Sequence, residues 1–68
     1  MEKINYKNII KEKYPDAVLD YTYFNGNIAY YIDMTINNTG FESDYYENCT
    51  KEHVWEEVYN ILKQKDLI

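Results

Sequence analysis

Residues 18–36 have the sequence VLDYTYFNGNIAYYIDMTI, and this stretch decides the fold. Asn25-Gly26 is a strong signal for a two-residue hairpin turn, because both central positions of a type I′ turn need a positive φ. On either side of the turn, apolar and polar side chains alternate with the period of a β-strand. We therefore expect two antiparallel strands, at residues 18–24 and 27–36.

A third strand is expected at residues 41–46, after a four-residue turn at 37–40. Together the two turns fix the register of the three strands, and in this register one face of the sheet stays apolar throughout. The opposite face carries acids and tyrosines, with Tyr45 turned away from it. The expected cross-strand pairs are Tyr21–Tyr30, Leu19–Ile32, Ile36–Phe41, Met34–Ser43, Ile32–Tyr45, Tyr31–Tyr46 and Asp33–Asp44.

Helices are expected at both ends of the chain. Residues 4–14 place apolar side chains at helical spacing, and Pro15 ends this helix because the residue before a proline avoids helical geometry. A second helix is expected from Lys51 to about Lys65, with Thr50 as its N-cap. The apolar positions of the two helices are Tyr6, Ile9, Ile10 and Tyr14 in the first and Val54, Trp55, Val58, Ile61 and Leu62 in the second.

The predicted fold is therefore α+β, a three-stranded antiparallel meander with an N-terminal and a C-terminal helix packed on one face. The order is α-β-β-β-α, and residues 1–68 form a single domain. A core of this size is small, but tyrosine, phenylalanine and tryptophan make up 18% of the residues and bury much area each.

The charge balance bears on the class of partner. Twelve acids against seven lysines, with no arginine, give a net charge of −5. This argues against direct binding of nucleic acid and against an anionic membrane surface, and it favours a basic protein partner. The chain has no long apolar run and no signal-peptide pattern at its start, so we expect a cytoplasmic protein. Its bias toward residues with AT-rich codons suggests a phage or mobile element of a low-GC bacterium.

The outward face of the sheet and the acidic start of the second helix are the candidate partner-binding surface. We expect a small, non-enzymatic inhibitor or adaptor that docks this surface on the basic site of a nucleic-acid-binding protein, such as a defence nuclease, as a nucleic-acid mimic. The candidate residues are Asp20, Tyr31, Asp33, Glu42, Asp44 and Tyr46, followed by Glu47, Glu52, Glu56 and Glu57.

Two alternatives remain open. Cys49, His53 and Glu57 follow one another at i, i+4 spacing, a pattern that a cysteine-dependent enzyme or a metal site could use. A hard cation could be held by three acids, Asp33, Glu42 and Asp44, but these lack the spacing of a calcium-binding loop. We therefore expect no cofactor or metal.

The second alternative is a structural homodimer formed through the outward face of the sheet. Its apolar contacts would come from Val18, Phe24, Tyr31 and Tyr46. The sequence leaves open whether the protein is a monomer or a homodimer.

Overall fold

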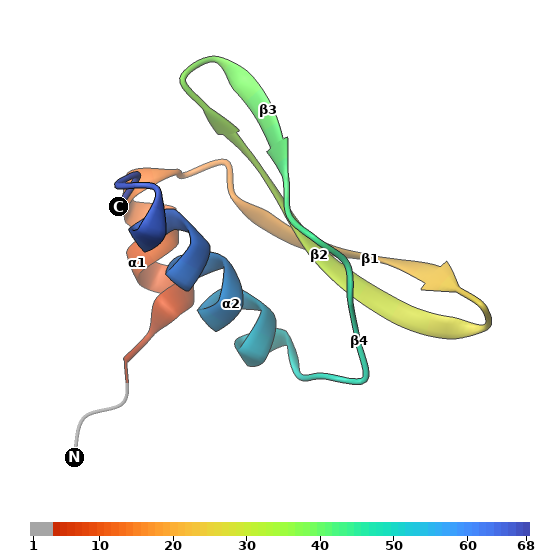
Figure 1. Ribbon diagram of the computed structural model, residues 1–68. Helices are drawn as coiled ribbons and strands as arrows, with labels where there is room; N and C mark the ends of the chain where they lie inside the picture. Colours follow the sequence, from red (N-terminus) through yellow and green to blue (C-terminus); the bar gives the residue numbers. More distant parts are fainter. Residues whose placement is uncertain (1–3) are drawn as a thin grey trace.

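The structure is a computed structural model that describes residues 4–68. It confirms the predicted α+β fold and the order of its elements, although the third strand is divided into two short pieces. Both helices lie on the same side of the twisted sheet (Figure 1). The elements are α1 Tyr6–Lys13, β1 Val18–Phe24, β2 Asn27–Ile36, β3 Thr39–Glu42, β4 Tyr46–Glu47 and α2 Lys51–Gln64.

The first hairpin has the predicted register. Asn25 and Gly26 form its turn with φ values of 52° and 82°, as a type I′ turn requires. Tyr21 pairs with Tyr30 along the two strands, and every other predicted pair between β1 and β2 is confirmed.

The second turn is shorter than predicted. The chain reverses at Asn37 and Asn38, whose φ values of 51° and 64° again suit a two-residue turn, and Ile36 therefore pairs with Thr39. Asparagine tolerates this left-handed backbone better than most residues, which explains how the turn forms without glycine. The register moves by two residues relative to the prediction, so the residues of β3 keep their expected faces.

A bulge at residues 43–45 separates β3 from β4. Ser43 donates its backbone N–H to the carbonyl of Ile32 at 2.9 Å, and its Oγ accepts the N–H of Ile32 at 2.8 Å. The hydroxyl thus takes the place that a backbone carbonyl fills in a regular ladder. It also donates to the carbonyl of Asp44 at 3.0 Å, so the buried side chain is fully bonded.

The bulge adds one residue, so the strand beyond it presents the opposite faces to those predicted. Tyr46 pairs with Tyr30 and packs against the core, whereas Tyr45 lies on the outward side. The predicted pairing of Asp33 with Asp44 is wrong, because Asp33 pairs with Glu42.

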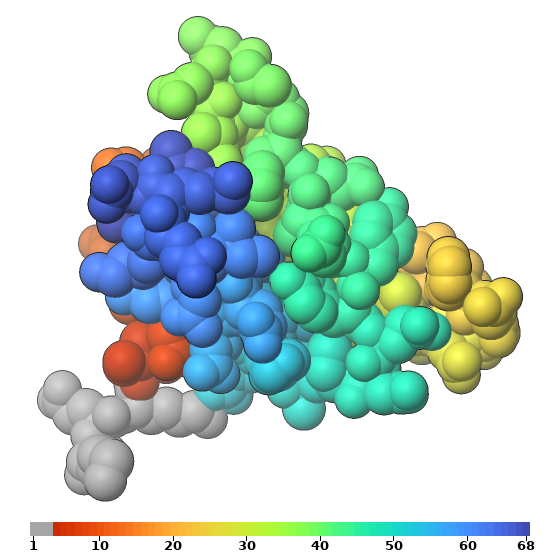
Figure 2. All heavy atoms as spheres, in the orientation of Figure 1, coloured from red at the N-terminus to blue at the C-terminus, as the bar shows by residue number. Residues whose placement is uncertain are grey.

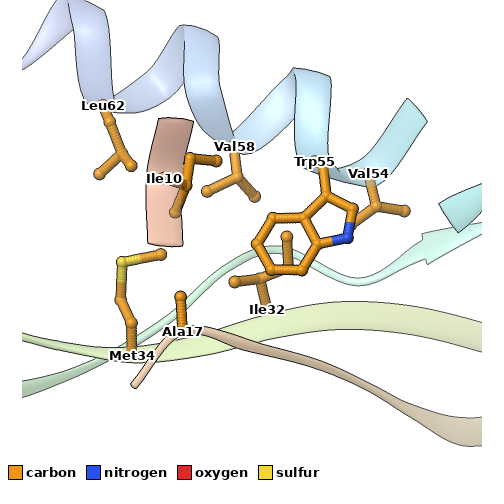
Figure 3. Close-up of a cluster of buried hydrophobic side chains, with 8 residues drawn as sticks. All are labelled: Ile10, Ala17, Ile32, Met34, Val54, Trp55, Val58 and Leu62. Atoms are coloured by element: carbon orange, nitrogen blue, oxygen red, sulfur yellow. The ribbon is translucent and has the colours of Figure 1, made fainter. Parts of the chain in front are cut away.

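The core lies between the two helices and the middle of β2. Figure 3 shows side chains of α2 pointing toward Ile32 and Met34 of β2, with Ile10 of α1 closing one side. Of the five α2 positions predicted to be apolar, four are buried and one, Ile61, is half-buried. The fully enclosed cluster comprises Ile10, Ala17, Ile32, Met34, Val54, Trp55, Val58 and Leu62.

Both helices begin at side-chain caps. The Asn5 side chain accepts the N–H of Asn8 at 3.1 Å, so α1 starts slightly later than predicted. Thr50 Oγ1 accepts the N–H of His53 at 3.1 Å, which confirms its predicted role at the start of α2. In the described part of the chain neither helix has the length and apolar run needed to cross a membrane.

The helices cover only part of the apolar face of the sheet. The end of the β1–β2 hairpin extends past them as a separate projection (Figure 2). Tyr21 and Tyr23 are 55% and 69% exposed although they point to the helix side, and Ile28 beside them is 42% exposed. The helices therefore shield the apolar face only near the middle of the sheet.

We expect the Ser43→Ala substitution to lower the free energy of unfolding by about 1–3 kcal/mol, because the buried N–H of Ile32 would lose its acceptor. Urea unfolding followed by the fluorescence of Trp55, the single tryptophan, measures this loss. The matched control is Thr35→Ala, which removes an exposed hydroxyl from the same sheet and should cost less than about 1 kcal/mol. Equal losses for the two variants would contradict the role assigned to the hydroxyl.

The second turn offers an independent test. Asn38→Ala should lower the free energy of unfolding by about 1–2 kcal/mol, because alanine is disfavoured at positive φ, whereas Asn38→Gly should match or exceed the wild type. As a control, Asn60→Ala in the exposed side of α2 should be neutral or stabilising, since alanine favours helices. Thermal unfolding compares the three; a stable Asn38→Ala variant would argue against the two-residue turn.

Candidate binding surface

Charge is segregated along the chain. Residues 18–47, which contain all the strands, hold five acids and no lysine, arginine or histidine. The other seven acids are matched in number by the seven lysines, which all lie outside this range. The net charge of −5 therefore corresponds to the sheet alone, and the helical parts are balanced.

Two tyrosines stack on the outward face of the sheet, the face turned away from the helices. The rings of Tyr31 and Tyr45 lie 4.8 Å apart between centroids and only 12° from parallel. Tyr45 also donates its hydroxyl to Oε1 of Glu42 at 2.8 Å. This bond and the stacking hold Tyr45 in place although 47% of it is exposed.

Three carboxylates surround this stack. Asp20 of β1 pairs directly with Tyr31, and Glu42 of β3 pairs directly with Asp33. Like charges directly across a sheet destabilise it, so the Asp33–Glu42 pair is not explained by the stability of the fold. We define the acidic tyrosine face as Asp20, Tyr31, Asp33, Glu42 and Tyr45.

The acids change the ionisation of both phenols. Desolvation, followed by the negative charges of Asp20, Glu42 and Asp33, raises the pKa of Tyr31 above its ordinary value. The hydrogen bond to Glu42 is the largest cause of the raised pKa of Tyr45, with desolvation next. Both rings therefore stay neutral at physiological pH, and Tyr45 remains a hydrogen-bond donor to Glu42.

The predicted site residues fall into two groups. Asp20, Tyr31, Asp33 and Glu42 share the outward face as predicted, and Glu47 lies on it opposite Ala29. Of the remaining predicted residues, Tyr46 lies on the helix side and Asp44 lies in the bulge. The other three are on α2 and do not contribute to that face: Glu52, Glu56 and Glu57.

The placement of Tyr46 on the outward face is wrong because of the bulge. Asp44 lies within the bulge and does not pair with Asp33, which pairs with Glu42. Tyr46 is half-buried against the core, and burial followed by the charges of Asp44 and Glu57 raises its pKa. The acids that raise the pKa of Tyr31 are Asp20, Glu42 and Asp33 of the outward face. Tyr46 belongs to the helix side of the sheet.

Tyr45 is the surface residue that the sequence interpretation missed. The signal available was Ser43, a polar residue on the predicted apolar side of the sheet. A buried hydroxyl needs a hydrogen-bond partner, and a break in the backbone ladder provides one. A bulge at this serine would have exchanged the faces of Tyr45 and Tyr46.

The surroundings of Cys49 do not favour an activated thiol. His53 Nε2 lies 3.3 Å from Oε1 of Glu57, and Cys49 packs partly against the core. Burial and then the charge of Glu57 raise the pKa of the Cys49 thiol, whereas a nucleophilic cysteine needs a lowered pKa. Within residues 4–68 no group of three or more histidine, cysteine or acidic side chains is arranged to hold a metal.

A hollow between the two helices lies apart from Cys49, His53 and Glu57. A depression of about 450 Å³ lies where α1 and α2 begin, bordered by Tyr6, Lys51 and Trp55. Cys49 and His53 do not line it. The potentially reactive groups and this hollow therefore do not form one site.

The surface predicted for a homodimer also differs from the one in the structure, because the bulge moves Tyr46 to the helix side. Val18 and Phe24 are 50% and 55% exposed, and Tyr31 lies on the outward face. Tyr46, the fourth residue of that set, points to the helix side. The four residues therefore do not form one surface.

Comparison with known proteins finds no matching family model, no similar curated protein and no similar solved structure. Function must therefore be argued from the surface chemistry of this chain.

The pKa of Tyr45 should fall toward its ordinary value of about 10 in a Glu42→Gln variant, because the carboxylate acceptor and its charge are lost. NMR titration of ¹³C-labelled tyrosine rings measures the change. The control Glu47→Gln removes one charge from the same face without removing that hydrogen bond, and should leave the pKa of Tyr45 nearly unchanged.

The raised pKa values also set the direction of the pH dependence. Since folding favours the neutral phenols, their contribution to stability is complete below pH about 10 and is lost as the pH rises through the folded-state pKa.

For the Glu42→Gln variant, a Tyr45 that titrates identically to the wild type would contradict the bond between the two side chains.

Proposed function

We propose that the protein is a non-enzymatic binding module that docks its acidic tyrosine face on a cationic site of another protein. The observation that carries this proposal is the concentration of the net charge of −5 in residues 18–47, a range that contains no lysine, arginine or histidine. Five acids within one small sheet oppose its folding through mutual repulsion. A cationic partner would remove that repulsion on binding, so the same charges favour association and speed up encounter.

The stacked tyrosines supply the apolar part of such a contact. Tyrosine rings are common at the centres of interfaces because they bury large areas and lose little side-chain freedom. Here Tyr31 and Tyr45 already hold each other in place, and Glu42 fixes the second ring. Little ordering would remain to be done on binding, which favours affinity.

A nucleic-acid-binding site is the cationic surface that best fits these features. Single-stranded nucleic acid presents flat stacked rings beside negative charges. Proteins that bind it contact the charges with basic grooves and the rings with aromatic side chains. The acidic tyrosine face offers stacked rings beside carboxylates, so it could occupy such a groove. The protein would then act as an inhibitor, and a nuclease of a bacterial defence system is the partner class we propose.

Capture on the immobilised protein, from a lysate of a low-GC bacterium, tests this function. We expect basic nucleic-acid-binding proteins to be retained at low salt, and to be released by high salt or by single-stranded DNA. The double variant Asp33→Asn/Glu42→Gln should bind the captured protein at least about tenfold more weakly, because two carboxylates of the face are gone.

The matched control is Glu12→Gln/Asp66→Asn, which changes the net charge equally but alters only exposed acids outside the sheet. This variant should retain the captured protein almost as well as the wild type. Equal losses in the two double variants would show that net charge alone governs binding, and retention unaffected by salt would also contradict the proposal.

A further inference from the structure

The β1 strand is an open edge of the sheet. The strand order is β1–β2–β3, with β4 also paired to β2, so β1 has a neighbour on one side only. Long edge strands in proteins are commonly blocked by lysine or proline, and β1 contains neither. Its seven residues instead include four apolar or aromatic side chains that are at least 50% exposed. They are Val18, Tyr21, Tyr23 and Phe24.

The register shows which backbone groups of β1 face outward. In a two-residue hairpin the residues flanking the turn, Phe24 and Asn27, exchange hydrogen bonds, and bonding pairs then recur at every second residue. The N–H and C=O groups of the alternate residues, Leu19, Tyr21 and Tyr23, therefore point away from β2. They form a ladder that an additional strand could complete.

The side chain of Asp20 occupies the backbone donor at the centre of this edge. Its Oδ1 accepts the outward N–H of Tyr21 at 2.8 Å, so the middle donor of the ladder is occupied by a side chain. A cation on an approaching strand could draw the carboxylate of Asp20 toward itself. The same movement would release the N–H of Tyr21 to the backbone of the new strand.

The two sides of the edge differ in chemistry. On the outward side, Asp20 lies beside the other carboxylates of the acidic tyrosine face. On the helix side, the rings of Tyr21 and Tyr23 meet edge to face with their centroids 6.1 Å apart, and a shallow hollow joins them to Ile28 and Tyr30. Lys51 of α2 also lines this hollow, with its Nζ 6.0 Å from the centroid of the Tyr30 ring. A strand added to β1 would therefore meet negative charge with one set of alternate side chains. The other set would meet a mainly aromatic surface, where Lys51 would repel a further cation and favour an apolar side chain.

We propose that β1 is a docking edge for an extended, basic segment of a partner protein, in which lysine or arginine alternates with apolar residues. This mode of binding, addition of a strand to an exposed sheet edge, combines backbone hydrogen bonds with selection of alternate side chains. The inference rests on the proposed function, since both require a cationic partner, and it adds how that partner pairs. A second copy of the chain fits the edge less well, because it would place two acidic faces side by side.

A synthetic peptide of about ten residues that alternates lysine and valine, with both ends blocked, is the probe. We expect it to protect the N–H groups of Leu19, Tyr21 and Tyr23 from hydrogen exchange. It should bind about tenfold more tightly than a peptide of the same composition with lysines and valines in two blocks. Equal binding of the two peptides, or no binding, would overturn the inference.

A matched pair of variants tests the backbone contact. Tyr21→Pro and Tyr21→Val both remove the ring, but only proline removes the outward N–H, and edge strands tolerate proline at such a position. We expect Tyr21→Pro to bind the alternating peptide at least about fivefold more weakly than Tyr21→Val. Similar affinities would overturn the inference, and native Trp55 fluorescence verifies that each variant folds.

A charge reversal keeps the test independent of how Tyr21→Pro folds. In Asp20→Lys the alternating lysine–valine peptide should lose affinity, and an alternating glutamate–valine peptide should gain it. Unchanged preference would overturn the inference. Concentration-dependent protection of the same three N–H groups without peptide would also overturn it, by showing that a second copy occupies the edge.

These outcomes separate the edge from the acidic tyrosine face. If the alternating peptide fails to bind but Asp33→Asn/Glu42→Gln still releases the captured protein, only the docking edge is refuted. If the peptide binds β1 but that double variant retains the captured protein, only the proposed function is refuted.

Discussion

The two hydrogen bonds between Ile32 and Ser43 determine what the rest of the sheet presents to solvent. The strand gains a residue at this point, and the serine hydroxyl replaces the backbone carbonyl that would otherwise accept the N–H of Ile32. Without that acceptor, a buried donor would be left unpaired at a substantial cost. Because the bulge is stabilised here, Tyr46 enters the core and Tyr45 reaches the outward face. The stacked tyrosine pair therefore depends on a serine on the other side of the sheet.

The distribution of charge does not favour the stability of the isolated chain. A small domain is stabilised by burying apolar surface, and the helices do this over the middle of β2. The sheet beyond that region keeps aromatic side chains in water and places Asp33 opposite Glu42. Neither feature helps the isolated chain to fold. Both are understandable in a surface that is completed by a partner with opposite charge.

Much of the fold followed from local signals in the sequence, because each signal acted over a few residues. Asn25-Gly26 set the first register, Thr50 set the start of α2, and Pro15 the end of α1. The second register was predicted wrongly because an Asn-Asn turn can be mistaken for the start of a longer loop. The bulge was missed since its cause, the bond between Ser43 and Ile32, joins residues that meet only after the strands have paired. The one extra residue of the bulge exchanged the faces of Tyr45 and Tyr46.

Asp20 connects the acidic tyrosine face with the open edge of the sheet. Its carboxylate accepts the N–H of Tyr21 along β1, and its charge is one cause of the raised pKa of Tyr31 across the ladder. A cation that moved this carboxylate would therefore act on both surfaces at once: it would open the backbone donor and weaken the field around the tyrosine stack. For a partner that contacts both the edge and the face, binding at one surface would favour binding at the other, because both contacts involve the carboxylate of Asp20. The sheet register thus places one carboxylate where it links the proposed docking edge to the acidic tyrosine face.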